Sequence, residues 1–239
     1  MQQIICRYAK RGLAQYVSHL DTMRALERAL RRAGLPLVYS QGHNPRLRLS
    51  FAAALPVGVS SEAELMALHL EAPVDPDEVR DRVNGQLPEG FEILAAWTPP
   101  AYRKRQTFGS VDTADYRVRV EGPVDPEAAA AGIVTLLEAD ELLAQRGGDR
   151  GERTVNVRPC LLALGVEEAG DEHLELKMTL RTGSKGGAKP QEILTGLRLD
   201  SRAYRITLHR TALYAQSQSA PTAIHVARRP GPLGPRRRP

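Results

Sequence analysis

The chain has 239 residues, 42% of them hydrophobic, which is enough for one large domain or for two of roughly 100 residues each. No apolar run approaches the roughly 18 residues of a membrane helix, and Arg7 and Lys10 lie where a secretory signal would be apolar. We therefore expect a soluble, cytoplasmic protein with no membrane partner. Its two cysteines, Cys6 and Cys160, lie in separate apolar runs, which favours free thiols over a disulfide.

The net charge of +5 is sorted along the chain. Residues 1–48 contain nine basic and two acidic side chains, whereas residues 49–100 contain two basic and nine acidic ones. A general solubility effect would not separate the two signs in this way. The segregation predicts a basic face near the start of the chain, which suits an anionic partner.

Residues 1–100 predict the order strand, helix, strand, strand, helix, strand. A Ser18 cap with Asp21 three residues later predicts the start of the first helix, and a second helix starts at Asp75 or Pro76. The apolar residues that recur at helical spacing in the first helix, and so are expected in the core, are Leu20, Met23, Leu26 and Leu30. Alternation of apolar and polar residues predicts strands at 4–12, 46–52, 62–71 and 91–97.

The same order returns after a polar stretch, residues 101–115, that reads as a linker. The predicted strands are 116–120, 154–165, 173–181 and 204–214, and the predicted helices are 126–139 and 190–197. Pro159 makes the second of these strands an edge or bulged strand. The fold class we expect is α+β, with two tandem ferredoxin-like (βαββαβ) units, each with its own antiparallel sheet, at residues 1–100 and 116–215, and a disordered basic C-terminal tail at residues 216–239.

The first helix carries the most informative surface. Four arginines share one exposed stripe, with Glu27 as the acid beside them: Arg24, Arg28, Arg31 and Arg32. Like charges at this spacing repel each other, so a stripe of this kind suggests an anionic partner such as a phosphate backbone. A solvated basic face, or a face that docks on an acidic protein, remains an alternative.

A second candidate is the loop that follows this helix. Its glycine and asparagine allow unusual backbone angles, and an imidazole lies beside two arginines. The residues expected to contact phosphate or base edges are Gln41, Gly42, His43, Asn44, Arg46 and Arg48. A plain turn would need the Gly42, Asn44 and Pro45 positions alone.

Other motifs are weaker. Residues 182–189 (TGSKGGAK) do not satisfy the phosphate-loop pattern, and the six scattered histidines do not form a zinc motif. Ser18, His19 and Asp21 are triad residue types, but neighbours in a helix cap diverge in direction and serve the helix end. These motifs leave any catalytic residue unassigned, and we predict no metal and no cofactor in this chain.

Two stretches carry a family resemblance: YVSHLDTMRALERALRRAGLPLVYSQGHNPRLRLSFAAALPVGVSSEAE at residues 16–64 and, more loosely, TVNVRP at residues 154–159. They resemble the bacterial radical SAM-linked protein family, a domain of unknown function that occurs beside a radical SAM enzyme or fused to it. The matching positions are Ser18, His19, Asp21, Arg28, Arg32, Gly42, Asn44 and Pro45, whereas His43 replaces an aromatic residue usual in that family. The genomic context of the family implies RNA processing or modification.

This chain has no C-x-x-x-C-x-x-C motif, and two cysteines are too few to hold an iron–sulfur cluster. The resemblance therefore implies a non-catalytic accessory protein that binds RNA while a separately encoded radical SAM enzyme performs the chemistry. Two alternatives stay open. One is a metal-independent endoribonuclease with paired ferredoxin-like units, in which His19 or His43 is the general base. The other is an adaptor that binds protein alone; the sequence leaves the oligomeric state undetermined.

Overall fold

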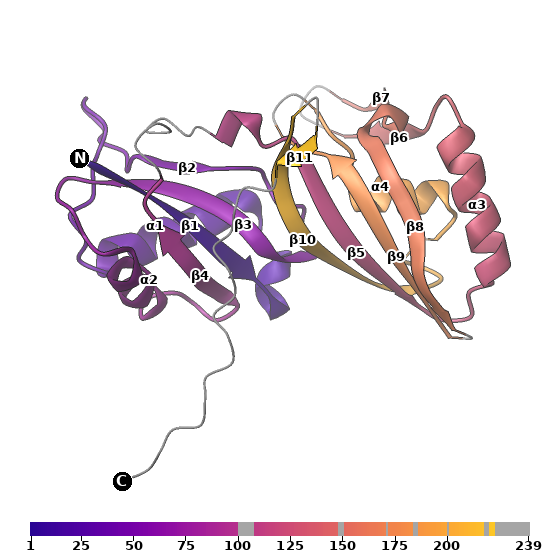
Figure 1. The fold of residues 1–239 in the computed structure, drawn as a ribbon, viewed down its shortest axis with the longest axis horizontal. Helices are drawn as coiled ribbons and strands as arrows, with labels where there is room; N and C mark the ends of the chain where they lie inside the picture. The colour runs from indigo at the N-terminus through magenta and orange to yellow at the C-terminus, as the bar shows by residue number, and fades with distance from the viewer. Residues whose placement is uncertain are drawn as a thin grey trace, which may run out of the picture.

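The computed structural model describes residues 1–99, 108–147, 151–170, 172–183, 186–199, 201–217 and 220–222. Within these ranges the protein is a mixed α+β structure with four α-helices and a mostly antiparallel sheet. The elements of the first half lie on the left of Figure 1 and those of the second half on the right. No helix in the described ranges combines the length and the apolarity required to span a bilayer.

The first half contains four strands and two α-helices in the predicted order. Ser18 caps the first helix by accepting a hydrogen bond from the Asp21 backbone N–H at 3.1 Å, and Asp75 caps the second. Both predicted helix starts are confirmed. The elements are β1 (Gln2–Lys10), α1 (His19–Arg32), β2 (Leu49–Phe51), β3 (Val59–Leu70), α2 (Pro76–Asn84) and β4 (Phe91–Trp97).

The second half repeats this order with an added hairpin. Asp125 caps its first helix in the same manner as Asp75, since each accepts hydrogen bonds from two backbone N–H groups after a proline. The elements are β5 (Thr113–Glu121), α3 (Pro126–Glu138), β6 (Leu143–Arg146), β7 (Arg153–Asn156), β8 (Leu161–Gly170), β9 (His173–Arg181), α4 (Pro190–Gly196), β10 (Arg205–Ser217) and β11 (Ala220–Thr222).

The expectation of two separate sheets is wrong. One sheet of nine strands runs in the order β4-β1-β3-β10-β5-β9-β8, with β2 paired to β3 and β11 paired to β10. The halves join where β10 pairs in parallel with β3, through Leu208 opposite Val59 and Arg210 opposite Ser61. The short β2 pairs with β3 from Met66 to Leu68, so the start of β3 keeps free backbone groups that β10 satisfies.

Side chains from α1 and α2 pack on one face of β1 and β3. The buried residues of α1 are Thr22, Ala25, Leu26, Ala29 and Leu30. Leu26 and Leu30 are in the core as predicted, but Leu20 is 54% exposed and Met23 is half-buried, so these two assignments are wrong. The buried stripe is rotated from the predicted one and includes two small residues, Ala25 and Ala29.

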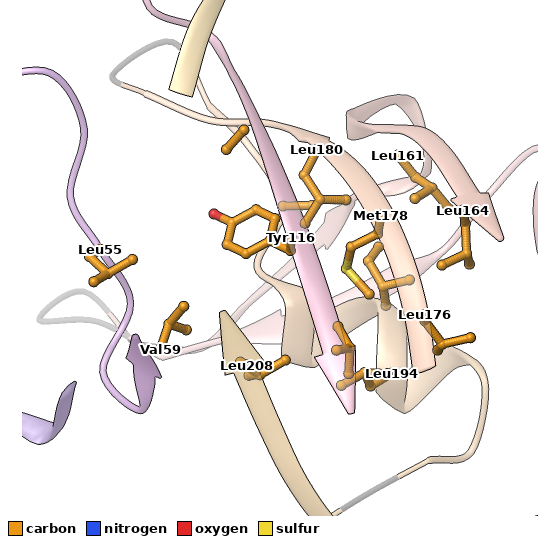
Figure 2. Close-up of a cluster of buried hydrophobic side chains, with 14 of the residues drawn as sticks. Leu55, Val59, Tyr116, Leu161, Leu164, Leu176, Met178, Leu180, Leu194 and Leu208 are labelled. Atoms are coloured by element: carbon orange, nitrogen blue, oxygen red, sulfur yellow. The ribbon is translucent and has the colours of Figure 1, made fainter. Parts of the chain in front are cut away.

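A second cluster fills the other half of the molecule. Leu176, Met178 and Leu180 of β9 face residues of α4 and β8 around Tyr116 of β5 (Figure 2). The hydroxyl of Tyr116 is directed away from these side chains, toward the segment that carries Leu55. Ile5 and Leu65 of the first half belong to the same cluster, so the apolar core continues across the junction.

Three predicted boundaries need correction. The strand expected at 154–165 is two strands, β7 and β8, with a short 3-10 turn at Arg158–Cys160 between them, because Pro159 cannot donate to a ladder. The predicted linker, residues 101–115, ends earlier than expected, because β5 starts at Thr113. Residues 101–107 of the predicted linker lie outside the described ranges. The predicted tail starts too early, because β10 runs to Ser217 and pairs with β11; residues 223–239 lie outside the description. Both cysteines are free, as predicted, but of the two thiols expected to be buried Cys6 is buried and Cys160 is half-buried.

Candidate functional site

The arginine stripe on α1 is partly neutralised. Arg24 forms an ion pair with Asp21 at 3.1 Å, and Arg31 lies 3.9 Å from Glu27 and 6.0 Å from the ring centroid of Tyr39. Arg28 and Arg32 form no ion pair with the described part of the chain and line a small cavity of about 230 Å³ beside α2. The predicted stripe therefore contributes two unpaired guanidinium groups instead of four.

The loop at residues 41–46 is exposed along its whole length. Its ends are held by Ser40, whose backbone N–H donates to the Arg46 carbonyl at 2.8 Å and whose hydroxyl accepts from the Arg46 N–H at 2.9 Å. Gly42 has a φ of 127°, a conformation that favours glycine. The predicted residues Gln41, Gly42, His43, Asn44 and Arg46 do not line the main cavity, and of this group Arg48 alone does.

The main cavity lies between the two halves and has a volume of about 1310 Å³. We refer to it as the cleft. Its charged and histidine lining residues are His19, Arg48, His69, Arg146, Lys189 and Arg210. No aspartate or glutamate is among the described residues that line it. Arg48 and Lys189 form no ion pair with described residues, whereas Arg146 and Arg210 are paired with carboxylates behind the lining, so the first two supply the unpaired positive charge of the cleft.

One wall of the cleft includes polar residues of β1, of β3 and of the segment just before β2. Gln3 of β1 lies opposite His69 of β3, and the His69 ring contacts the carbonyl oxygen of Arg48 at 3.4 Å. The Gln3 side-chain carbonyl oxygen is buried and has no hydrogen-bond partner in the described structure. Alternation along β1 places Gln3 on the opposite face from Ile4, which packs under the helices. The lining of the cleft therefore includes an unsatisfied acceptor on Gln3 and the cation of Arg48.

The opposite wall comes from β6 and from the segment before α4. Arg146 donates to both carboxylate oxygens of Glu192 at 2.7 Å and to the Gly187 carbonyl at 2.7 Å. Although burial opposes its charge, the pKa of Arg146 is raised, because Glu192 accepts these hydrogen bonds. Lys189, in the same segment, is exposed and forms no ion pair with the described residues.

The floor of the cleft is a buried ionic cluster. Arg210 of β10 donates to both carboxylate oxygens of Glu64 on β3, at 3.1 and 3.2 Å, and each side chain is 1% exposed. It also donates to the Tyr116 hydroxyl at 2.8 and 3.1 Å and to the Ala54 carbonyl at 3.1 Å. Burial opposes the charge of Arg210, but Glu64 and Tyr116 more than offset this and raise its pKa.

The charges of Arg210 and Glu64 affect the pKa values of two further residues, Lys10 and His19. Lys10 is 1% exposed and donates to the Val17 carbonyl at 2.6 Å, and its pKa is lowered by burial although Glu64 opposes the shift. His19 is half-buried with its ring edge-on to Phe51 at 5.7 Å, and burial lowers its pKa; Glu64 opposes this shift, while Lys10 and Arg210 add to it. The imidazole is therefore neutral near pH 7.

The sequence predicted His19 and Arg48 but missed Arg146, Lys189 and the floor cluster. The sequence contained a pattern that could have indicated the floor cluster. Arg210 lies on the same face of its strand as the buried Leu208, and Glu64 lies on the same face of its strand as Met66 and Leu68. Two charged residues are therefore at inward-facing positions. A charge buried in such a position requires a partner, and the two residues are partners of each other.

Fold and cleft together define a mixed α+β protein whose two halves share one sheet and enclose a positively charged cavity. The described residues hold no group of three or more histidine, cysteine, aspartate or glutamate side chains arranged for a metal ion. Residues 3–190 match DUF2344, described as an uncharacterized protein conserved in bacteria, and the chain belongs to that family. Membership of a domain family of unknown function is thus confirmed, whereas the radical SAM link remains a prediction. A search of curated proteins gives no match.

Among solved structures, the chain is similar to one in a Cbf5-Nop10-Gar1 complex, with 12% identity, a TM-score of 0.44, and coverage of 88% of this chain and 48% of that one. A chain of the archaeal box H/ACA sRNP Nop10-Cbf5 complex gives 9% identity and a TM-score of 0.43, with coverage of 87% and 46%. A chain of an H/ACA RNP bound to a substrate RNA containing 2'-deoxyuridine gives 14% identity and a TM-score of 0.42, with coverage of 87% of this chain and 46% of that one. The protein spans about half the length of these chains.

Proposed function

We propose that this protein is a non-catalytic accessory subunit that binds single-stranded RNA in the cleft, while a separately encoded radical SAM enzyme modifies or processes that RNA. The observation that carries the RNA-binding part is the charge of the cleft, which has no described carboxylate among its lining and four cationic lining residues, two of which, Arg48 and Lys189, form no ion pair with described residues. A polyanionic strand gains affinity from such a groove by neutralising phosphates and releasing counterions. The radical SAM partner rests on the sequence resemblance alone.

The cleft replaces the α1 stripe as the main binding surface in this proposal. Arg48 and Lys189 are exposed on opposite walls and form no ion pair with described residues, so their charges are available to phosphates. Phe51 lines the cleft and is half-buried, which suits the stacking of a base. Arg28 and Arg32 are then secondary contacts for a longer strand.

We also propose that each half is a ferredoxin-like unit. The pairing order β4-β1-β3-β2 in the first half and β10-β5-β9-β8 in the second supports this assignment, since both follow the same pattern of elements. The β6–β7 hairpin is an insertion in the second unit, and it supplies Arg146 to the cleft.

The test compares two charge-matched double variants, Arg48→Glu/Lys189→Glu in the cleft and Arg28→Glu/Arg32→Glu on α1. Binding to a labelled single-stranded RNA is measured by fluorescence anisotropy at several salt concentrations. We expect the cleft variant to lose at least about 10-fold in affinity and to have a shallower salt dependence, because each lost phosphate contact lowers the slope by roughly 0.7 for a single strand. The α1 variant should lose less. Equal binding by the cleft variant and the wild type would overturn the proposal.

The endoribonuclease alternative is favoured by one observation, the position of the His19 imidazole in the lining of the cleft. It predicts cleavage of bound RNA in the presence of a chelator, and the loss of that cleavage in His19→Gln. Intact RNA after prolonged incubation with the wild type would exclude it. Stable association with the radical SAM enzyme without any RNA affinity would instead favour the protein-binding adaptor.

A further inference from the structure

The hydroxyl of Tyr116 is a hydrogen-bond donor without an acceptor in the described structure. Its oxygen accepts two hydrogen bonds from Arg210, at 2.8 and 3.1 Å, so its own proton must be donated elsewhere. Burial raises the pKa of Tyr116, although Arg210 opposes the shift, and the phenol therefore keeps its proton near pH 7. The residue lines the cleft, and its hydroxyl is directed away from the apolar core (Figure 2).

His19 is a second group of this kind. Its ring lines the cleft and contacts Phe51 edge-on, but it forms no hydrogen bond with the described residues. A neutral imidazole has one N–H donor and one acceptor nitrogen. Because α1 begins at His19, the positive end of this helix also lies at the cleft.

The charges behind these two donors do not balance. Arg210 and Lys10 are both buried, with 0% and 1% of their surface exposed, and both interact with the single carboxylate of Glu64. A buried excess of positive charge is costly unless an anion lies near it. The cleft that Tyr116 and His19 line also reaches Arg210 of this cluster.

We infer that the floor of the cleft binds one phosphate group, with the Tyr116 hydroxyl and the His19 imidazole as direct donors and with Arg210 and Lys10 as the buried positive charge behind them. The inference rests on the proposed function, because the phosphate is a phosphodiester of the bound RNA strand. Its single negative charge matches the excess of one positive charge in the cluster. Arg210 is a positioning residue, since its N–H groups are occupied by Glu64, Tyr116 and Ala54.

The experiment uses Tyr116→Phe and His19→Leu, with Tyr214→Phe and His173→Leu as controls that remove the same groups outside the cleft. Binding of single-stranded RNA is measured by fluorescence anisotropy, and binding of inorganic phosphate alone by ³¹P NMR line broadening. We expect each cleft variant to bind RNA about 10-fold more weakly, as for the loss of a hydrogen bond to a charged group, and to lose the phosphate broadening. The controls should keep both.

Thermal unfolding separates a binding defect from a folding defect. Tyr116→Phe also removes an acceptor from Arg210, so this variant can lose stability for structural reasons. His19 forms no hydrogen bond with the described residues, and His19→Leu carries the test if the tyrosine variant does not fold. Competition of inorganic phosphate with RNA in the wild type, absent in His19→Leu, is a readout that a purely structural role would not change.

Three outcomes decide between the claims. RNA affinity within about twofold of the wild type in both cleft variants overturns the floor site and leaves the proposed function standing. Phosphate binding at the floor without any RNA affinity overturns the proposed function and keeps the phosphate site. An equal loss of affinity in the controls overturns the floor site, because the donors would then not be specific to the cleft.

Discussion

Arg210 on β10 and Glu64 on β3 form an ion pair across the junction of the two halves, with the guanidinium Nη1 at 3.1 Å from one carboxylate oxygen and each side chain 1% exposed. The pair lies beside the parallel contact of the two strands, where Arg210 is opposite Ser61. The same guanidinium holds Tyr116 and the carbonyl of Ala54, so one side chain connects β3, β5, β10 and the segment that follows β2. The floor of the cleft therefore depends on the union of both halves.

Replacing Glu64 by glutamine should destabilise the protein strongly. The variant leaves Arg210 buried without its counter-charge, a change that costs about 3–5 kcal/mol in comparable buried pairs. Urea denaturation followed by circular dichroism measures the effect. The matched control is Glu62→Gln on the same strand, which breaks an exposed ion pair with Arg11 and should cost at most about 1 kcal/mol. Similar losses for the two variants would contradict the buried-pair account.

Stability should fall as the pH is lowered from about 7 to about 5. Burial lowers the pKa of His19, near Glu64, Lys10 and Arg210, and that of His209, near Glu62, Arg11 and Arg117. A histidine with a lowered pKa in the folded state binds its proton more readily when unfolded, so protonation favours unfolding.

The measurement for this pH effect is the urea midpoint across the same range, in the wild type and in His19→Gln/His209→Gln. The double variant should show a flatter dependence, since the two groups no longer titrate. Carboxylates with lowered pKa values, such as Asp21 and Glu192, act mainly at lower pH and remain in both proteins. A dependence of the same slope in the two proteins would show that these histidines do not control it.

The two thiols should differ in reactivity. Burial raises the pKa of Cys6 to about 12, so almost no thiolate forms near pH 8, and the side chain is fully buried. Cys160 is half-buried. An aromatic disulfide reagent should modify Cys160 first and should reach Cys6 on unfolding, with mass spectrometry identifying the site. Rapid modification of Cys6 in the native protein is the contrary result.

Two glycines with similar backbone angles should respond differently to alanine. Gly90 has a φ of 85° and Gly58 a φ of 82°, so each substitution strains the backbone by roughly 1–2 kcal/mol. A Cβ at Gly90 would lie 2.7 Å from both the Ala14 Cβ and the Arg11 carbonyl oxygen, whereas a Cβ at Gly58 has nothing within 4 Å. Gly90→Ala should therefore be clearly the less stable variant in thermal unfolding, and the reverse order would refute the packing argument.

Local signals predicted most of the elements. β4 and β9 have the predicted ends, and the caps at Ser18 and Asp75 start their helices. These features depend on alternation, helical spacing and capping, which act over a few residues and are visible in a sequence. The division of one predicted strand into β7 and β8 was missed although Pro159 marked it, because the partner of each segment is not local information.

The sequence by itself determined the α+β class, the order of the elements apart from the added β6–β7 hairpin and β11, and the uneven distribution of charge. The tertiary structure alone decided that β3 and β10 pair, which unites two predicted sheets and brings Arg210 to Glu64 across 145 intervening residues. It also decided which cations are free to bind an anion, since Asp21 and Glu27 pair with two arginines of α1, while Arg48 and Lys189 line the cleft without an ion pair to described residues. Charge is a property of composition, but its availability depends on which side chains the fold places within a few ångströms of each other.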